Sequence, residues 1–61
     1  MKVYACYLRI QKVEHWEIVS EDVQFITDSY QKAVEEVIDG SWYSEDGYFF
    51  YTPYYKEFDL Q

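Results

Sequence analysis

The chain of 61 residues carries a formal net charge of −7 and is long enough for one small domain, residues 1–61, with no room for a second. One cysteine and one histidine exclude an internal disulfide and a zinc site, and no apolar run reaches the roughly 18 residues of a membrane span. The single thiol favours a reducing cytoplasm, and alternating apolar and polar residues at the start lead us to expect no signal peptide.

The first predicted element is a strand over Lys2–Lys12. Its apolar side chains recur at every second position, which is the period of a strand that buries one face. These positions are Tyr4, Cys6, Leu8 and Ile10. A tight connection near Val13 is expected to fold the chain back as a hairpin.

The second predicted strand is long, from His15 to Ile26. Its apolar alternation changes parity between Ile18 and Val23, with Val23 and Phe25 expected on one face. A shift of one residue turns every following side chain to the opposite face. We therefore expect a bulge at Ser20–Asp22, with a turn between two short strands as the alternative.

A helix of about eleven residues is predicted within Asp28–Gly40. One apolar stripe at helical spacing supports it: Tyr30, Ala33, Val34, Val37 and Ile38. Asp28 is the expected N-cap, Gln31 can complete a capping box, and Gly40 stands where a left-handed residue ends a helix. So short a helix is marginal alone, so the stripe must pack on a sheet.

The remaining residues predict a brief strand or loop at Trp42 and Tyr43, a turn at Ser44–Gly47 and a last strand from Tyr48. Pro53 lacks an N–H, which places it on a sheet edge or at a bulge. The order β-β-α-β predicts an α+β fold, a small antiparallel sheet of three to four strands with one helix packed on one face. One helix leaves the second face of that sheet uncovered.

The sequence contains no recognisable catalytic or metal-binding pattern. His15 is the only candidate base, and Cys6 falls on the predicted core face, where a thiol is inert. Neither glycine belongs to a phosphate-binding loop, and the carboxylates lack the spacing of a calcium loop. We therefore expect a protein that is not an enzyme, with no metal and no cofactor. Five scattered basic residues against twelve acidic ones argue against direct nucleic-acid binding.

Several acidic residues stand where they oppose local stability. Glu35, Glu36 and Asp39 come at the end of the predicted helix, where the helix dipole disfavours negative charge, and the next loop adds Glu45 and Asp46. Residues that oppose local stability are typical of functional sites, although exposed acidic residues can also simply keep a surface solvated. We expect the acidic residues to face a basic protein, with apolar anchors beside them: Trp42, Tyr43 and Tyr48.

In length, acidity and tyrosine content the chain resembles small inhibitor proteins of bacteriophages, among them DNA mimics of the anti-CRISPR, anti-restriction and uracil-DNA glycosylase inhibitor types. The segment VQFITDSYQKAVEEV, which passes from strand into helix, is also similar to the inhibitor of bacterial RNA polymerase from the T7 group. The resemblance implies binding and inhibition of a basic nucleic-acid-handling host protein. Mimicry of DNA would require the negative charge to be gathered on one side. The alternative is a self-associating module, a homodimer that pairs through an aromatic sheet face or an edge.

Overall fold

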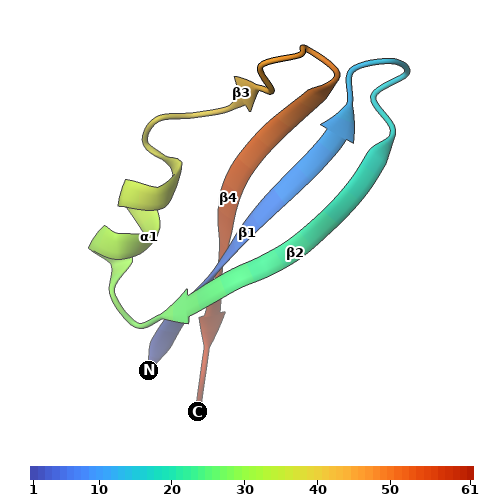
Figure 1. Ribbon diagram of the computed structural model, residues 1–61. Helices are drawn as coiled ribbons and strands as arrows, with labels where there is room; N and C mark the ends of the chain where they lie inside the picture. The colour runs from blue at the N-terminus through green and yellow to red at the C-terminus, as the bar shows by residue number, and fades with distance from the viewer.

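The computed structural model describes all 61 residues and contains one four-stranded antiparallel sheet with one helix (Figure 1). The elements are β1 (Lys2–Lys12), β2 (Ile18–Thr27), α1 (Tyr30–Val37), β3 (Trp42–Tyr43) and β4 (Phe49–Asp59). The strand order is β2-β1-β4-β3, and both chain ends lie at one end of the sheet. The predicted α+β fold is confirmed.

β1 is an inner strand and has the predicted bounds. It pairs with β2 along one edge and with β4 along the other, so its side chains set the two faces of the sheet. Tyr4 and Cys6 pack against Ala33 of α1, which defines the helix-side face. The opposite face, which no helix covers, is called the helix-free face. It receives the odd-numbered residues of β1: Val3, Ala5, Tyr7, Arg9 and Gln11.

β2 is bulged as predicted, but the bulges lie at other residues. The pairing with β1 skips Val19 and Gln24, whereas Ser20–Asp22 is regularly paired. The bulge at Gln24 sends Val23 to the helix-free face and Phe25 to the helix-side face, so the prediction that they share a face is wrong. The sequence could not locate the bulge, because an apolar-polar-apolar triplet fits an unbroken strand equally well.

The hairpin near Val13 is confirmed, but the second strand begins later than predicted. Residues 13–16 form the turn, and β2 starts at Ile18 rather than at His15. His15 and Trp16 both have left-handed backbones, with φ of 65° and 56°. No glycine or asparagine announces this turn, since ordinary residues occupy the two left-handed positions.

α1 is shorter than predicted and begins one residue later. Its N-cap is Ser29, whose hydroxyl accepts the Lys32 N–H at 3.3 Å, so the assignment of the cap to Asp28 is wrong. Thr27, the last residue of β2, accepts the Ser29 N–H at 3.1 Å and so positions Ser29 at the helix start. Gly40 is left-handed as predicted, with φ of 75°. The capping-box role of Gln31 is not observed, because its side chain contacts Glu35 instead.

Very little of the molecule is buried. Only Tyr4, Ala5, Cys6 and Ala33 are buried, and Ile38, at the end of the predicted stripe, is 72% exposed. The molecule is a slab of 42 × 20 × 13 Å with a radius of gyration of 13.1 Å, against about 10.5 Å for a compact chain of this length. Its accessible surface of 4696 Å² also exceeds the roughly 4,250 Å² of a compact monomer.

The last part of the chain follows the prediction, except that the last strand begins at Phe49 rather than at Tyr48. Trp42 and Tyr43 form the short strand β3, paired with β4, and residues 44–47 form the turn. β3 pairs only with Tyr51 and Phe50, so the outer edge of β4 is free at Pro53, which suits a residue without an N–H. The only helix, α1, is too short to cross a membrane.

Candidate protein-binding faces

Negative charge is concentrated in residues 28–46, which we call the acidic segment. It contains six acidic residues and one lysine, and so carries −5 of the total charge of −7. None of its carboxylates takes part in an ion pair, whereas Glu21 and Glu57 elsewhere pair with Arg9 and Lys2 at 3.2 Å and 3.7 Å. The acidic residues of the segment are Asp28, Glu35, Glu36, Asp39, Glu45 and Asp46.

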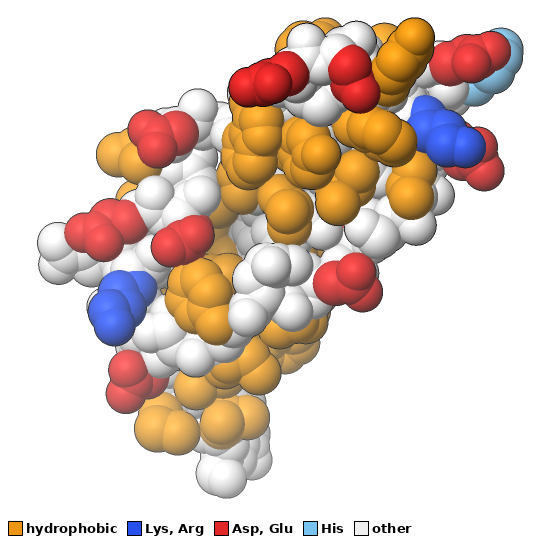
Figure 2. Space-filling view, viewed as in Figure 1, with side chains coloured by type: hydrophobic (Ala, Val, Ile, Leu, Met, Phe, Trp, Pro, Cys, Tyr) orange, Lys and Arg blue, Asp and Glu red, His pale blue; other side chains and the backbone are white.

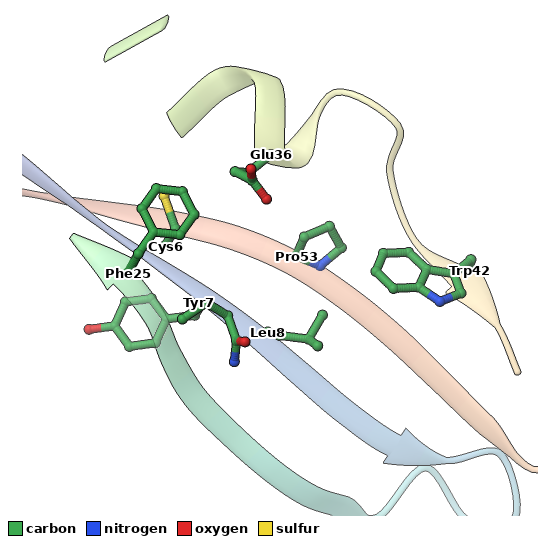
Figure 3. A pocket seen from close by; sticks show the side chains of 8 residues that line it. Cys6, Tyr7, Leu8, Phe25, Glu36, Trp42 and Pro53 are labelled. Carbon is green, nitrogen blue, oxygen red and sulfur yellow. The ribbon is translucent and has the colours of Figure 1, made fainter. Parts of the chain in front are cut away.

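A groove lies on the helix-side face, between α1, β3 and the sheet. Its volume is about 370 Å³. Figure 3 shows Glu36 reaching from α1 toward Pro53 of β4, with Leu8 of β1 beneath and Trp42 of β3 at one end. In Figure 2 apolar side chains gather over the sheet and β3, and carboxylates lie around them on α1 and at the tip beyond β3. This face therefore offers apolar surface with an acidic border.

The predicted acidic residues of the helix are all exposed, and one of them lines the groove. Glu35 accepts a hydrogen bond from the Gln31 amide at 3.4 Å, and Asp39 lies in the turn after α1. Glu36 is the one that lines the groove, together with Trp42.

The two predicted acidic residues of the β3–β4 turn differ in their surroundings. The side chain of Glu45 is exposed and has no partner within the chain. Asp46 accepts hydrogen bonds from the Ser44 hydroxyl at 2.5 Å and the Tyr48 N–H at 3.0 Å. These two donors lower the pKa of Asp46, so its charge persists to lower pH and its first role is to hold the turn.

The three predicted aromatic anchors do not share a face. Trp42 stacks on Tyr51 on the helix-side face, with ring centres 5.3 Å apart. Tyr43 packs on Phe50 on the helix-free face at 4.8 Å, because successive side chains of a strand alternate. Tyr48 is 71% exposed at the tip of the β3–β4 turn. Of the three, only Trp42 lines the groove beside Glu36.

The sequence interpretation missed a polar cluster at the centre of the helix-free face. Glu21 of β2 accepts hydrogen bonds from the Tyr54 hydroxyl and from Arg9, the latter at 3.2 Å. The Tyr54 ring stacks on Tyr7 with centres 5.0 Å apart, and Lys56 lies 5.3 Å from the centre of the Tyr7 ring. The hydrogen bonds from Tyr54 and Arg9 lower the pKa of Glu21.

An apolar patch lies next to this cluster, toward the chain ends. It borders a hollow of about 400 Å³ and has no polar lining residue. Val23 and Ile26 of β2 share this face only because the Gln24 bulge lies between them, which explains why the sequence did not reveal the patch. We call it the helix-free apolar patch; its residues are Val3, Ala5, Tyr7, Val23, Ile26, Phe58 and Leu60.

Cys6 and His15 do not form a catalytic pair. Cys6 is buried under α1, and burial, together with the charge of Glu36, raises the pKa of its thiol. His15 stands in the β1–β2 turn, about 20 Å along the strand from Cys6. No three His, Cys, Asp or Glu side chains are grouped to hold a metal ion.

Neither family models nor curated proteins nor solved structures gave a match to this chain. The candidate binding surfaces of the chain are the two faces of its sheet, one with an acidic border and one with an apolar patch.

Proposed function

We propose that the protein is a non-enzymatic inhibitor that binds a basic, nucleic-acid-handling protein through the helix-side face. The observation that carries this proposal is the acidic segment, with a net charge of −5 and no ion pair within the chain, beside an apolar groove. Bacteriophage inhibitors that the chain resembles act on such partners in the host cytoplasm.

Electrostatics favours a cationic partner on this side. The last turn of α1 contains no basic residue, and Glu35 and Glu36 lie at the negative end of the helix dipole. Carboxylates placed so destabilise the free helix, and a partner's arginines and lysines would remove that repulsion. Complementary charge also raises the rate of association and excludes acidic competitors.

The groove supplies an apolar anchor beside the charge. Trp42, stacked on Tyr51, forms one end of the groove, and Glu36 borders it. An arginine side chain fits both features, because its planar head pairs with a carboxylate and stacks on an aromatic ring. Tryptophan and arginine are also the residue types that dominate binding energy at protein interfaces.

The proposed imitation of DNA is partial. A duplex as long as the 42 Å axis of the slab carries about 25 phosphate charges, at one per roughly 1.7 Å. The chain has twelve acidic residues in total, six of them in the acidic segment. In this proposal the segment imitates only the part of a duplex that one protein groove contacts, and we expect the inhibitor to compete with DNA for that groove.

A charge-neutralised variant tests the proposal. Glu35→Gln, Glu36→Gln and Asp39→Asn are combined, and the matched control combines Glu14→Gln, Glu17→Gln and Asp59→Asn, which removes the same charge outside the acidic segment. The protein is immobilised, a bacterial lysate is passed over it, bound proteins are identified, and the purified partner is titrated against each variant. We expect a basic, nucleic-acid-binding partner whose affinity falls at least tenfold for the first variant only.

Two results would overturn the proposal. Equal loss of binding in both variants would mean that net charge alone acts, with no defined face. A partner that binds this protein and duplex DNA at the same time, without competition, would exclude the DNA-binding groove as the target.

A further inference from the structure

We propose that the helix-free face is the interface of a symmetric homodimer in which two copies pack sheet against sheet. This inference does not rest on the proposed function, because it concerns the opposite face of the sheet. It assigns the helix-free apolar patch, defined above, to contacts with a second copy of the chain.

The sheet lacks a second layer on the helix-free side. Sheets are stable when each apolar face packs against another element, and α1 covers the other face only. Ile26 is 65% exposed and Val23 48% exposed, although both stand at the hollow of a wholly apolar patch. With four buried residues, the monomer has less core than small domains without disulfides or metals normally need.

The helix-free face is large enough for a stable dimer interface. The two longer dimensions of the slab, 42 and 20 Å, give a whole face of roughly 800 Å², so two copies that overlap fully would each contribute what a partner contributes to an interface of standard size. A two-fold axis brings the same patch of both copies together, so each copy covers the apolar patch of the other. One sheet-to-sheet contact thus buries the exposed apolar patch of both molecules.

The distribution of charge also favours the helix-free face as the dimer interface. Two molecules that each carry a net charge of −7 repel each other, and this repulsion is weakest when they meet through a surface that is not itself acidic. This face has three charged residues, which are Arg9 of β1, Lys56 of β4 and Glu21 of β2. Arg9 and Glu21 form an ion pair. The acidic segment belongs to α1, β3 and their loops, so sheet-to-sheet packing keeps most of the negative charge away from the interface.

Edge-to-edge pairing is the weaker arrangement for a second copy. β2 presents a free outer edge, but bulges at Val19 and Gln24 interrupt its ladder, and Glu21 and Asp22 charge its centre. Bulges and charged side chains are features that protect edge strands from pairing with other chains. Unlike the β2 edge, the helix-free apolar patch contains no charged residue.

Sedimentation equilibrium on the full chain tests the dimer. We expect a dimer for the natural sequence at micromolar concentration. Ile26→Lys should weaken it about tenfold or more, because a charge would enter an apolar interface. Ile38→Lys is the matched control, since Ile38 is similarly exposed, at 72% against 65% for Ile26, but belongs to the end of α1, and it should leave the dimer unchanged. Circular dichroism confirms that both variants fold.

Intermolecular contacts locate the interface independently of mutation. In a mixture of isotope-labelled and unlabelled protein, nuclear Overhauser effects between copies should involve the methyl groups of Val3, Val23 and Ile26. A monomer up to about millimolar concentration would overturn the proposal. A dimer whose intermolecular contacts involve only Ile38 and Trp42 would overturn it as well, because it would use the helix-side face.

Discussion

Among single residues, Glu21 joins Arg9 and Tyr54 on the helix-free face. Its carboxylate receives the Tyr54 hydroxyl and the Arg9 guanidinium, and the Arg9 side chain lies over the Tyr54 ring at 5.1 Å. Hydrogen bonds to the charged form lower a carboxyl pKa. The pKa of Glu21 is accordingly lower than its ordinary value of 4.5 in the folded protein. This stabilisation is fully present above the unfolded-state pKa and is lost as pH falls through the folded-state value.

The first prediction concerns Tyr54→Phe. The hydroxyl of Tyr54 is the largest cause of the lowered pKa, with Arg9 next, so its removal should raise the Glu21 pKa toward 4.5 without restoring it fully. An NMR titration of the side-chain carboxyl carbon measures this. Tyr48→Phe is the control, because Tyr48 is remote in the β3–β4 turn, and it should leave Glu21 unchanged. An unchanged Glu21 pKa in Tyr54→Phe would show that Arg9 alone holds the carboxylate.

The β1–β2 turn provides a second prediction at the residue scale. His15 has a left-handed backbone, which costs a residue with a side chain about 1–2 kcal/mol, and its imidazole is exposed. His15→Gly should therefore stabilise the protein by about 1 kcal/mol despite the greater freedom of glycine when unfolded. Urea unfolding measures the change.

Glu14 is the matched control for that substitution. It occupies the same turn but is not among the residues with positive φ, so Glu14→Gly should destabilise the protein. If both glycine variants destabilised it to the same extent, the turn would not have the left-handed conformation described for His15.

At the scale of elements, the position of α1 depends on how β2 ends. β2 ends at Thr27, and the Thr27 hydroxyl accepts the Ser29 N–H. This hydrogen bond places Ser29 rather than Asp28 at the start of the helix. Ala33 then faces the sheet with no exposed surface, against Tyr4 and Cys6. The tilted rings of Tyr4 and Tyr30, 5.6 Å apart, extend this contact from the first turn of α1.

A comparison of two caps tests this placement. Ser29→Ala removes the hydroxyl that accepts the Lys32 N–H, and it should lower the free energy of unfolding by about 1 kcal/mol. Asp28→Ala should change it much less, since Asp28 makes no capping contact. Thermal unfolding of both variants measures the difference. A larger effect at Asp28 would return the cap to the residue that the sequence first suggested.

On the scale of the whole molecule, the slab has two unlike faces. The acidic segment borders the helix-side groove, while the helix-free face combines an apolar patch with a nearly neutral polar cluster. The two proposed interfaces therefore depend on different forces. Binding of a cationic partner relies on charge, and pairing of two copies relies on the burial of apolar surface.

Salt should separate the two interfaces. Between about 0.05 and 0.5 M salt the Debye length shortens from more than 10 Å to a few Å, which screens attraction between the acidic segment and a partner. We expect partner affinity to fall steeply over this range and the dimer to persist. Titration calorimetry and sedimentation at each salt concentration provide the measurements. Dissociation of the dimer by salt would contradict an apolar interface, and salt-independent partner binding would contradict an electrostatic one.

The sequence by itself determined what depends on near neighbours in the chain. The period of two in β1, the helical stripe around Ala33, the left-handed Gly40 and the turn before β4 each follow from a few consecutive residues. Together they were enough to predict the element order and the single helix on one face. The concentration of acid in residues 28–46 is likewise a property of the sequence.

Only the tertiary structure decided which side chains share a face. The bulge at Gln24 separates Val23 from Phe25, and the pairing of β3 with β4 turns Trp42 and Tyr43 to opposite sides. Strand register is fixed by pairing with a distant partner strand, and one residue of slip reverses every side chain. Local spacing therefore could not reveal the helix-free apolar patch, which exists because three separate strands align their apolar residues on the face that α1 leaves open.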